Sequence, residues 1–154
     1  MLKVEGTSEF AKRFARGEVP VFMDIRWVSG KPHWTVFVTK AAKKTAPHSY
    51  VDWAVRQIRL DTNDFIEREE CFGPPKDICV AQMPVVHEFG HTIGNIGGLH
   101  GGFSDEYHEG SPFSDDIASI LNRGDELRER HFNYLVNELR GIIPDTVFSL
   151  GRLQ

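Results

Sequence analysis

Residues 87–91 read His-Glu-Phe-Gly-His and are the part of this sequence best suited to chemistry. On a helix, with about 100° per residue, His87 and His91 lie roughly 40° apart and Glu88 roughly 100° from His87, so the three side chains point into one sector. Two neutral imidazoles can bind one zinc ion, and a catalytic zinc site has three protein ligands and keeps a fourth position for water. The spacing therefore predicts His87 and His91 as ligands of one catalytic zinc ion.

Glu88 lies next to this metal without being one of its ligands, which is the position of a general base. Zinc lowers the pKa of a bound water from about 15.7 to about 7, and an adjacent carboxylate can accept the proton. The resulting hydroxide attacks a polarised carbonyl, and the same carboxylate then protonates the leaving amine. Chance occurrence on an exposed helix is the alternative, but the flanking Val86 and Phe89 predict a buried helix, in which unpaired histidines are costly.

The third ligand is not fixed by spacing, and here a family resemblance helps. The pattern is similar to that of metzincin-type zinc peptidases, HExxHxxG followed by a third ligand, but the expected ligand position is Gly97, which has no side chain. The run Ser104-Asp105-Glu106-Tyr107 resembles the Asp-Glu-Tyr element of IgA-peptidase-like and bacterial effector-like zinc peptidases. That resemblance implies Asp105 as third ligand, with residues 96–104 as an insertion.

Other side chains compete for roles at the same site. His100, among flexible glycines, is an alternative third ligand, and Glu106 is a weaker one. Tyr107 could donate a hydrogen bond to the oxyanion of a tetrahedral intermediate, or could be a packed aromatic residue with a satisfied hydroxyl. His131 lies on the apolar stripe of the last predicted helix, where it could orient a ligand carboxylate or be a hydrogen-bonded core histidine. These alternatives stay open at the level of sequence.

A second resemblance covers residues 119–131. Residues 119–124, Ser-Ile-Leu-Asn-Arg-Gly, followed by Arg128, Arg130 and His131, resemble the Ser-Ile-Met-Asn-x-Gly turn and Arg-x-Arg-His helix of the same group. Leu121 stands where the turn methionine is expected, and its similar volume would preserve a hydrophobic floor under the metal. Together the resemblances span roughly residues 78–140, and they imply a zincin-like fold and a zinc peptidase.

The segments before the motif predict a small sheet. Ser8 can cap a helix over residues 9–16. Residues 19–28 and 33–39 alternate apolar and polar side chains, which predicts two antiparallel strands joined by a turn. Residues 51–60 predict a third strand, which the zincin-like arrangement would place at an edge where an extended peptide substrate can pair.

The segments around and after the motif predict helices. Pro84 is tolerated in a first helical turn, so the motif helix is expected from about there to Gly94, followed by a glycine-rich loop to residue 114. A last helix is expected over about 125–140. The predicted fold is α+β and zincin-like: a small, mostly antiparallel sheet with an active-site helix and a C-terminal helix. We expect one domain over residues 1–154, with a sheet subdomain at about 1–77 and the site at about 78–154.

Composition limits the classes of partner. The chain has 154 residues, a net charge of -4 and 26% charged residues, which is ordinary for a soluble globular protein. It has no basic stripe that would favour nucleic acid, no run of about 20 apolar residues that would span a membrane, and no apolar signal-peptide segment. We expect a soluble chain whose partner is a peptide or protein substrate. Its oligomeric state and compartment are unknown from sequence, although the effector-like resemblance implies delivery or secretion.

Two further questions stay open. Cys71 and Cys79 flank a loop with glycine and prolines, so they could form a disulfide or remain two free thiols. The predicted function is hydrolysis of peptide bonds by a zinc metallopeptidase. The alternatives are a zinc hydrolase that acts on cell-wall peptide or another amide, and a non-catalytic zinc-binding module.

Overall fold

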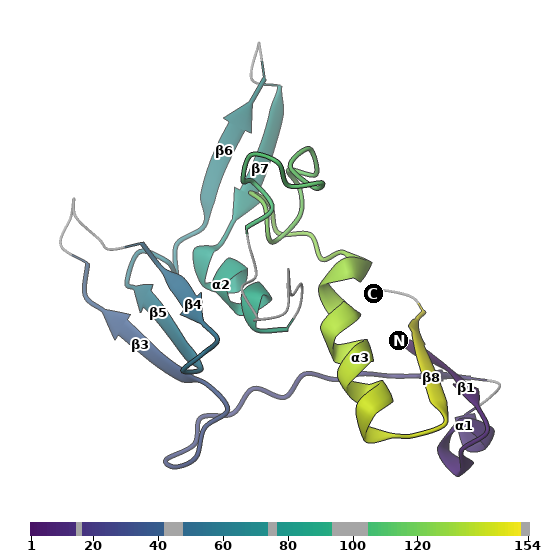
Figure 1. Ribbon diagram of the computed structural model, residues 1–154. Coiled ribbons are helices and arrows are strands. Elements are labelled where there is room, and N and C mark those ends of the chain that lie inside the picture. Colours follow the sequence, from purple (N-terminus) through teal and green to yellow (C-terminus); the bar gives the residue numbers. More distant parts are fainter. Residues whose placement is uncertain (15–16, 42–47, 74–76, 94–104, 152–154) are drawn as a thin grey trace.

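The computed structural model describes residues 1–14, 17–41, 48–73, 77–93 and 105–151 (Figure 1). These residues form an α+β protein with small, mostly antiparallel sheets, as the sequence predicts. None of the helices in these ranges is both long and apolar enough to cross a bilayer. The helices are α1 (Glu9–Phe14), α2 (Pro84–Ile93), the 3₁₀ helix η1 (Glu129–Phe132) and α3 (Asn133–Ile142). The strands are β1 (Leu2–Gly6), β2 (Glu18–Val19), β3 (Thr35–Thr39), β4 (Tyr50–Asp52), β5 (Gln57–Asp61), β6 (Arg68–Phe72), β7 (Ile78–Gln82) and β8 (Thr146–Leu150).

The first and last strands of the described chain lie side by side. β1 is the central strand of the sheet β2-β1-β8 and is antiparallel to both neighbours. The side chain of Ser8 accepts a hydrogen bond from Ala11 N at 2.9 Å, so the predicted cap of the first helix is present. That helix ends at Phe14, and the predicted continuation to residue 16 lies outside the described residues. α1 and α3 pack on this sheet around a core of Leu2, Val4, Ala11, Val136 and Phe148.

The strand predicted over residues 19–28 is wrong for most of its length. Only Glu18 and Val19 pair with β1, and residues 20–28 form an extended segment without strand pairing that runs from this sheet towards β3 (Figure 1). Pro20 has no backbone N–H to donate to a ladder, which accounts for the end of β2 at Val19. The predicted hairpin between residues 19–28 and 33–39 is therefore absent.

The second sheet also differs from the prediction. β3 agrees with the strand predicted over 33–39, but it pairs in parallel with β5. The single strand predicted over 51–60 is two strands, β4 and β5, which pair with each other in antiparallel fashion. The reversal between them begins at Asp52, whose Oδ1 accepts a hydrogen bond from Ala54 N at 3.0 Å. In the order β3-β5-β4, β4 is an edge strand and β5 is central, so only residues 51 and 52 of the edge strand predicted over 51–60 lie in an edge strand.

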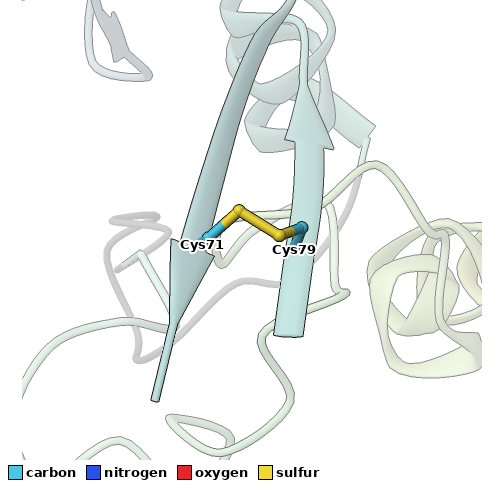
Figure 2. Close-up of a disulfide and its surroundings, with 2 residues drawn as sticks. All are labelled: Cys71 and Cys79. Atoms are coloured by element: carbon cyan, nitrogen blue, oxygen red, sulfur yellow. A yellow bond between two sulfur atoms is a disulfide. The ribbon is translucent and has the colours of Figure 1, made fainter. Parts of the chain in front are cut away.

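β6 and β7 form a hairpin that leads into the motif helix, and neither of its strands is among the strands predicted from the sequence. Cys71 and Cys79 lie directly opposite each other in this pair and form a disulfide (Figure 2). The covalent bond joins two residues eight positions apart in sequence, so it closes a short loop. β7 then ends at Gln82, two residues before α2 begins.

α2 agrees closely with its prediction, whereas the C-terminal helix begins later than expected. Pro84 is the first residue of α2, and Met83 O accepts hydrogen bonds from Val86 N and His87 N, the first of the helix. The helix predicted over 125–140 is the 3₁₀ helix η1 followed by α3, which ends at Ile142. The chain then returns through β8 to pair with β1. The last strand of the segment 78–154 therefore belongs to the same sheet as the first strand of the segment 1–77.

Candidate metal centre

Three side chains predicted from the sequence converge at one point. His87 and His91 lie on α2, and Asp105 begins the described segment that follows. The two imidazole Nε2 atoms are 3.1 Å apart, and Asp105 Oδ1 lies 3.0 Å from His87 Nε2 and 3.1 Å from His91 Nε2. Both histidines are buried, and the aspartate side chain is 23% exposed. This buried group of two imidazoles and one carboxylate could hold a metal ion.

The spacing of the three atoms fits a tetrahedral metal. Zinc bonds of about 2.0–2.1 Å at tetrahedral angles place the ligand atoms about 3.3 Å apart, close to the observed separations. Two nitrogens and one carboxylate oxygen are also a donor set used by catalytic zinc, which leaves a fourth position for water.

The charges of the cluster are strongly perturbed. Burial lowers the pKa of His91, and the neighbouring His87 lowers it further, although the bond to Asp105 opposes both. Burial also acts to lower the pKa of His87, but the hydrogen bond to Asp105 and the charge of Glu88 outweigh it, so the net shift is upward. Burial would raise the pKa of Asp105, but its hydrogen bonds to the two histidines and Tyr107 hold it well below the ordinary range. Asp105 is thus ionised at neutral pH, as a carboxylate that could bind a metal ion should be.

Glu88 is buried beside the cluster, as a base that is not a ligand should be. Burial, with the nearby carboxylates of Asp105 and Asp64, raises its pKa to about 7, against a smaller lowering by His87. Its Oε2 has no hydrogen-bond partner among the described residues. A buried carboxylate oxygen left free in this way is available to a water or substrate proton.

A backbone carbonyl fixes the orientation of His87. The ring Nδ1 lies 2.6 Å from Ile120 O, so Nδ1 carries the proton and donates it to the carbonyl. With the proton on Nδ1, Nε2 is the nitrogen that would offer its lone pair to a metal ion bound between His87, His91 and Asp105. Gln82, at the end of β7, donates from Nε2 to the carbonyls of Asn122 and Gly124 at 3.1 and 3.2 Å and so holds the same turn in place.

The turn over residues 119–124 packs directly on the motif helix. Leu121 is fully buried, and a Cβ added to Gly90 would lie 3.1 Å from its Cδ2. The glycine of His-Glu-Phe-Gly-His therefore lets the turn approach α2, and Leu121 occupies the position for which a hydrophobic floor was predicted. Gly124 is required for a similar reason, because a Cβ there would lie 2.2 Å from Ala118 O.

Glu106 lies in a separate buried network behind the cluster. Its side chain is 1% exposed and accepts hydrogen bonds from Arg130 Nε at 2.7 Å, from Arg130 Nη2 at 2.6 Å and from Ser119 Oγ at 2.6 Å. Burial would raise its pKa, but these bonds hold the pKa well below the ordinary range. The cluster of possible metal ligands in the described chain includes Asp105 and leaves out Glu106. The other alternative ligand, His100, lies outside the described residues.

His131 belongs to this network. It is fully buried; its Nδ1 accepts a hydrogen bond from Arg128 N at 3.1 Å, so Nε2 carries the proton and faces Ser119 Oγ at 3.2 Å and Glu106 Oε1 at 3.4 Å. These contacts match the interpretation as a hydrogen-bonded core histidine. The carboxylate that it contacts belongs to Glu106, the neighbour of Asp105 in sequence.

Tyr107 lies at the solvent side of the cluster. Its ring stacks against that of His87 with centroids 6.3 Å apart and planes inclined by 23°. Burial raises the pKa of its hydroxyl, and the hydrogen bond that this hydroxyl gives to Asp105 raises it further. The guanidinium of Arg123 also contacts this ring, 5.5 Å from the centroid.

Three supporting residues had no predicted role. Trp53 Nε1 donates to His91 O at 2.8 Å and so ties the end of α2 to the segment after β4. Arg130 joins Glu106 to Asp116, and Gln82 holds the turn under the helix. Only Arg130 carried a signal in the sequence, because it belongs to the Arg-x-Arg-His element; nothing in the local patterns around Trp53 or Gln82 indicates these partners.

No family model matches the sequence, and no curated protein and no solved structure shows significant similarity to it. Fold class and donor geometry are therefore the basis for a functional conclusion.

Proposed function

We propose that the chain is a zinc-dependent peptidase in a zincin-like fold, with His87, His91 and Asp105 as the ligands of one zinc ion. The observation that carries the proposal is the convergence of His87 Nε2, His91 Nε2 and Asp105 Oδ1 at mutual distances of 3.0–3.1 Å beside a buried Glu88. A structural zinc site would need a fourth protein ligand, and the described residues supply three.

Each residue has a defined task in this proposal. Bound zinc would act as a Lewis acid and acidify a water molecule. Glu88 accepts the proton of that water through its free carboxylate oxygen and later gives it to the leaving amine. Tyr107, whose partly exposed ring stacks on His87, is placed to donate its hydroxyl hydrogen to the oxyanion once substrate displaces the bond to Asp105.

The sheet next to α2 offers a route for substrate binding. β4 is an edge strand, and the residue that follows it, Trp53, donates a hydrogen bond to His91 O. An extended peptide that adds to such an edge gains main-chain hydrogen bonds without depending on its sequence. We therefore propose peptides in extended conformation as the substrate class.

A pocket on the flank of α2 supports side-chain selection. It has a volume of about 260 Å³, and its lining includes Val86, the residue before His87. Its apolar walls carry two carboxylates, Glu67 and Asp125, so we propose that it accepts a long basic side chain of the peptide.

The test compares three variants on one panel of peptides. Glu88→Gln should keep about one zinc per chain and lose activity by about 10²–10⁴-fold, because the ligands remain and the base is gone. His91→Ala and Asp105→Ala should lose both zinc and activity. Glu69→Gln, an exposed acid on β6, is the control for removal of a carboxylate and should behave as wild type. Full activity in Glu88→Gln would contradict the proposed mechanism.

A further inference from the structure

The extended segment over residues 20–28 exposes large apolar side chains. Phe22 is 85% exposed, Ile25 72% and Trp27 90%. Val21, Met23 and Val28 in the same segment are also exposed. Folded proteins rarely leave so much contiguous apolar surface in water unless another molecule covers it.

The backbone of this segment is unused as well. Within the part of the chain that the structure describes, residues 20–28 have no strand partner and make no backbone hydrogen bonds. Yet their side chains alternate as in a strand: Val21, Met23, Ile25 and Trp27 share one face, while Asp24 and Arg26 lie on the other. The segment thus has the pattern of a strand and lacks a neighbour.

Two copies of this segment, placed side by side in antiparallel orientation, have side chains that match across the pair. In an antiparallel pair of two copies centred on Ile25, Asp24 of one copy lies opposite Arg26 of the other, and the reverse contact is identical by symmetry. In the same register Met23 lies opposite Trp27 and Phe22 lies opposite Val28. All of these cross-strand pairs are favourable kinds, opposite charges or apolar contacts.

Within one copy, Asp24 and Arg26 form an exposed ion pair with each other. Their side chains therefore already lie on the same side of the segment, with 60% and 77% of the side-chain surfaces exposed. In the two-copy arrangement each of them would have a charged partner directly opposite, so the pairing keeps both charges satisfied while it brings the apolar side chains of the two copies into lateral contact.

We propose that residues 20–28 are a dimerisation strand, which pairs in antiparallel register with the same segment of a second copy of this chain. The two strands would form a two-stranded ribbon with on the order of eight backbone hydrogen bonds. One face of the ribbon carries the pairs of Asp24 with Arg26. The other face brings together Val21, Met23, Ile25 and Trp27 of each copy. This pairing does not depend on the proposed zinc chemistry.

The experiment uses two charge reversals and their mixture. Asp24→Lys makes the segment positive and Arg26→Glu makes it negative, so each variant alone places like charges opposite each other at the strand pair. Each should weaken dimerisation at least about tenfold, measured by sedimentation velocity over a concentration series. Mixed in equal amounts, the two variants should form a heterodimer about as tightly as wild type. In that heterodimer the introduced lysine of one chain faces the introduced glutamate of the other, and the unchanged Arg26 faces the unchanged Asp24.

The control is Glu5→Lys on β1. It makes the same charge change on an exposed position of a strand that already has neighbours on both sides, and it should leave dimerisation unchanged. The reversed positions are exposed, so circular dichroism should report native folding in all variants. A wild-type chain that stays monomeric at about 500 µM overturns the proposal. So does dimerisation of both single variants as tight as wild type, or a mixture that stays monomeric.

Discussion

The cluster of His87, His91 and Asp105 and the segment over residues 20–28 differ in which side chains they bury and which they expose. Around the cluster, Glu106 and His131 are buried, and both have hydrogen-bond partners. In the segment, Trp27 and Phe22 are exposed and apolar. Buried polar groups persist only where their partners are in place, and exposed apolar groups persist only where something else covers them. The first region therefore indicates a centre held rigidly by its own chain, and the second a surface that depends on another molecule.

The largest effect on stability is expected from a change in the network of Glu106, Arg130 and His131. Glu106→Ala should lower the free energy of unfolding by about 3–5 kcal/mol, because the fully buried His131 and the half-buried Arg130 both lose this carboxylate partner. Urea unfolding followed by fluorescence measures the change. Glu106→Gln keeps the shape and one acceptor, so it should cost less than the alanine variant. Equal stability of Glu106→Ala and wild type would show that the network does not hold the turn.

The next effect concerns the contact between the turn and α2. Leu121→Ala should cost about 2–5 kcal/mol, because it leaves a cavity under Gly90 in a fully buried site. Leu121→Met conserves volume and should cost under about 1.5 kcal/mol, with zinc binding retained. Thermal unfolding and metal content of the two variants measure both quantities. A methionine variant as unstable as the alanine variant would rule out volume as the property that matters here.

A smaller effect is expected from pH. The hydrogen bond from Arg128 is the largest cause of the lowered pKa of Asp116, which lies at about 2; burial opposes it, and the hydrogen bond from Arg130 and the charges of both arginines add to the lowering. Because the pKa of Asp116 is lower in the folded state, its ionised form stabilises the fold at pH values above the unfolded-state pKa of about 3.8. This contribution is lost as the pH falls towards 2. Asp116→Asn should therefore be less stable than wild type by about 1 kcal/mol at pH 6, with a smaller difference at pH 2.5. A stability difference between Asp116→Asn and wild type that stays constant from pH 6 to pH 2.5 would contradict the lowered pKa of Asp116.

The smallest effect on folding should come from the exposed segment. Trp27→Ala should change the free energy of unfolding by less than about 0.5 kcal/mol at protein concentrations low enough to keep the chain monomeric. The tryptophan that contacts α2 gives the contrast: Trp53→Phe removes the hydrogen bond to His91 O and should cost about 1 kcal/mol. Chemical unfolding at low micromolar concentration compares them. A large loss in Trp27→Ala would mean that the segment packs on its own chain.

The sequence predicts those features that local rules determine. The cap at Ser8, the start of α2 at Pro84 and the shared sector of His87 and His91 each depend on a few adjacent residues. The resemblance to Asp-Glu-Tyr points to Asp105, which the structure brings to the two histidines. These predictions need no knowledge of distant partners.

Local sequence patterns do not predict which distant segments pair with each other. Alternation in residues 20–28 predicts a strand, but a strand exists only where a neighbour supplies hydrogen bonds, and in the described chain none does. The parallel pairing of β3 with β5 and the return of β8 to β1 likewise depend on chain packing. Arg130 binds Glu106, which lies 24 residues earlier in the chain, and the sequence around either residue does not indicate this contact.

The most direct test of the metal centre is a zinc titration of metal-free protein by isothermal titration calorimetry, with wild type beside Asp105→Ala and Asp105→Asn. The cluster predicts about one zinc per chain for wild type, binding at least tenfold weaker in Asp105→Asn, and none detectable in Asp105→Ala at the same concentrations. Unchanged zinc binding in Asp105→Ala, or no binding by wild type, would contradict the assignment of His87, His91 and Asp105 as a zinc site.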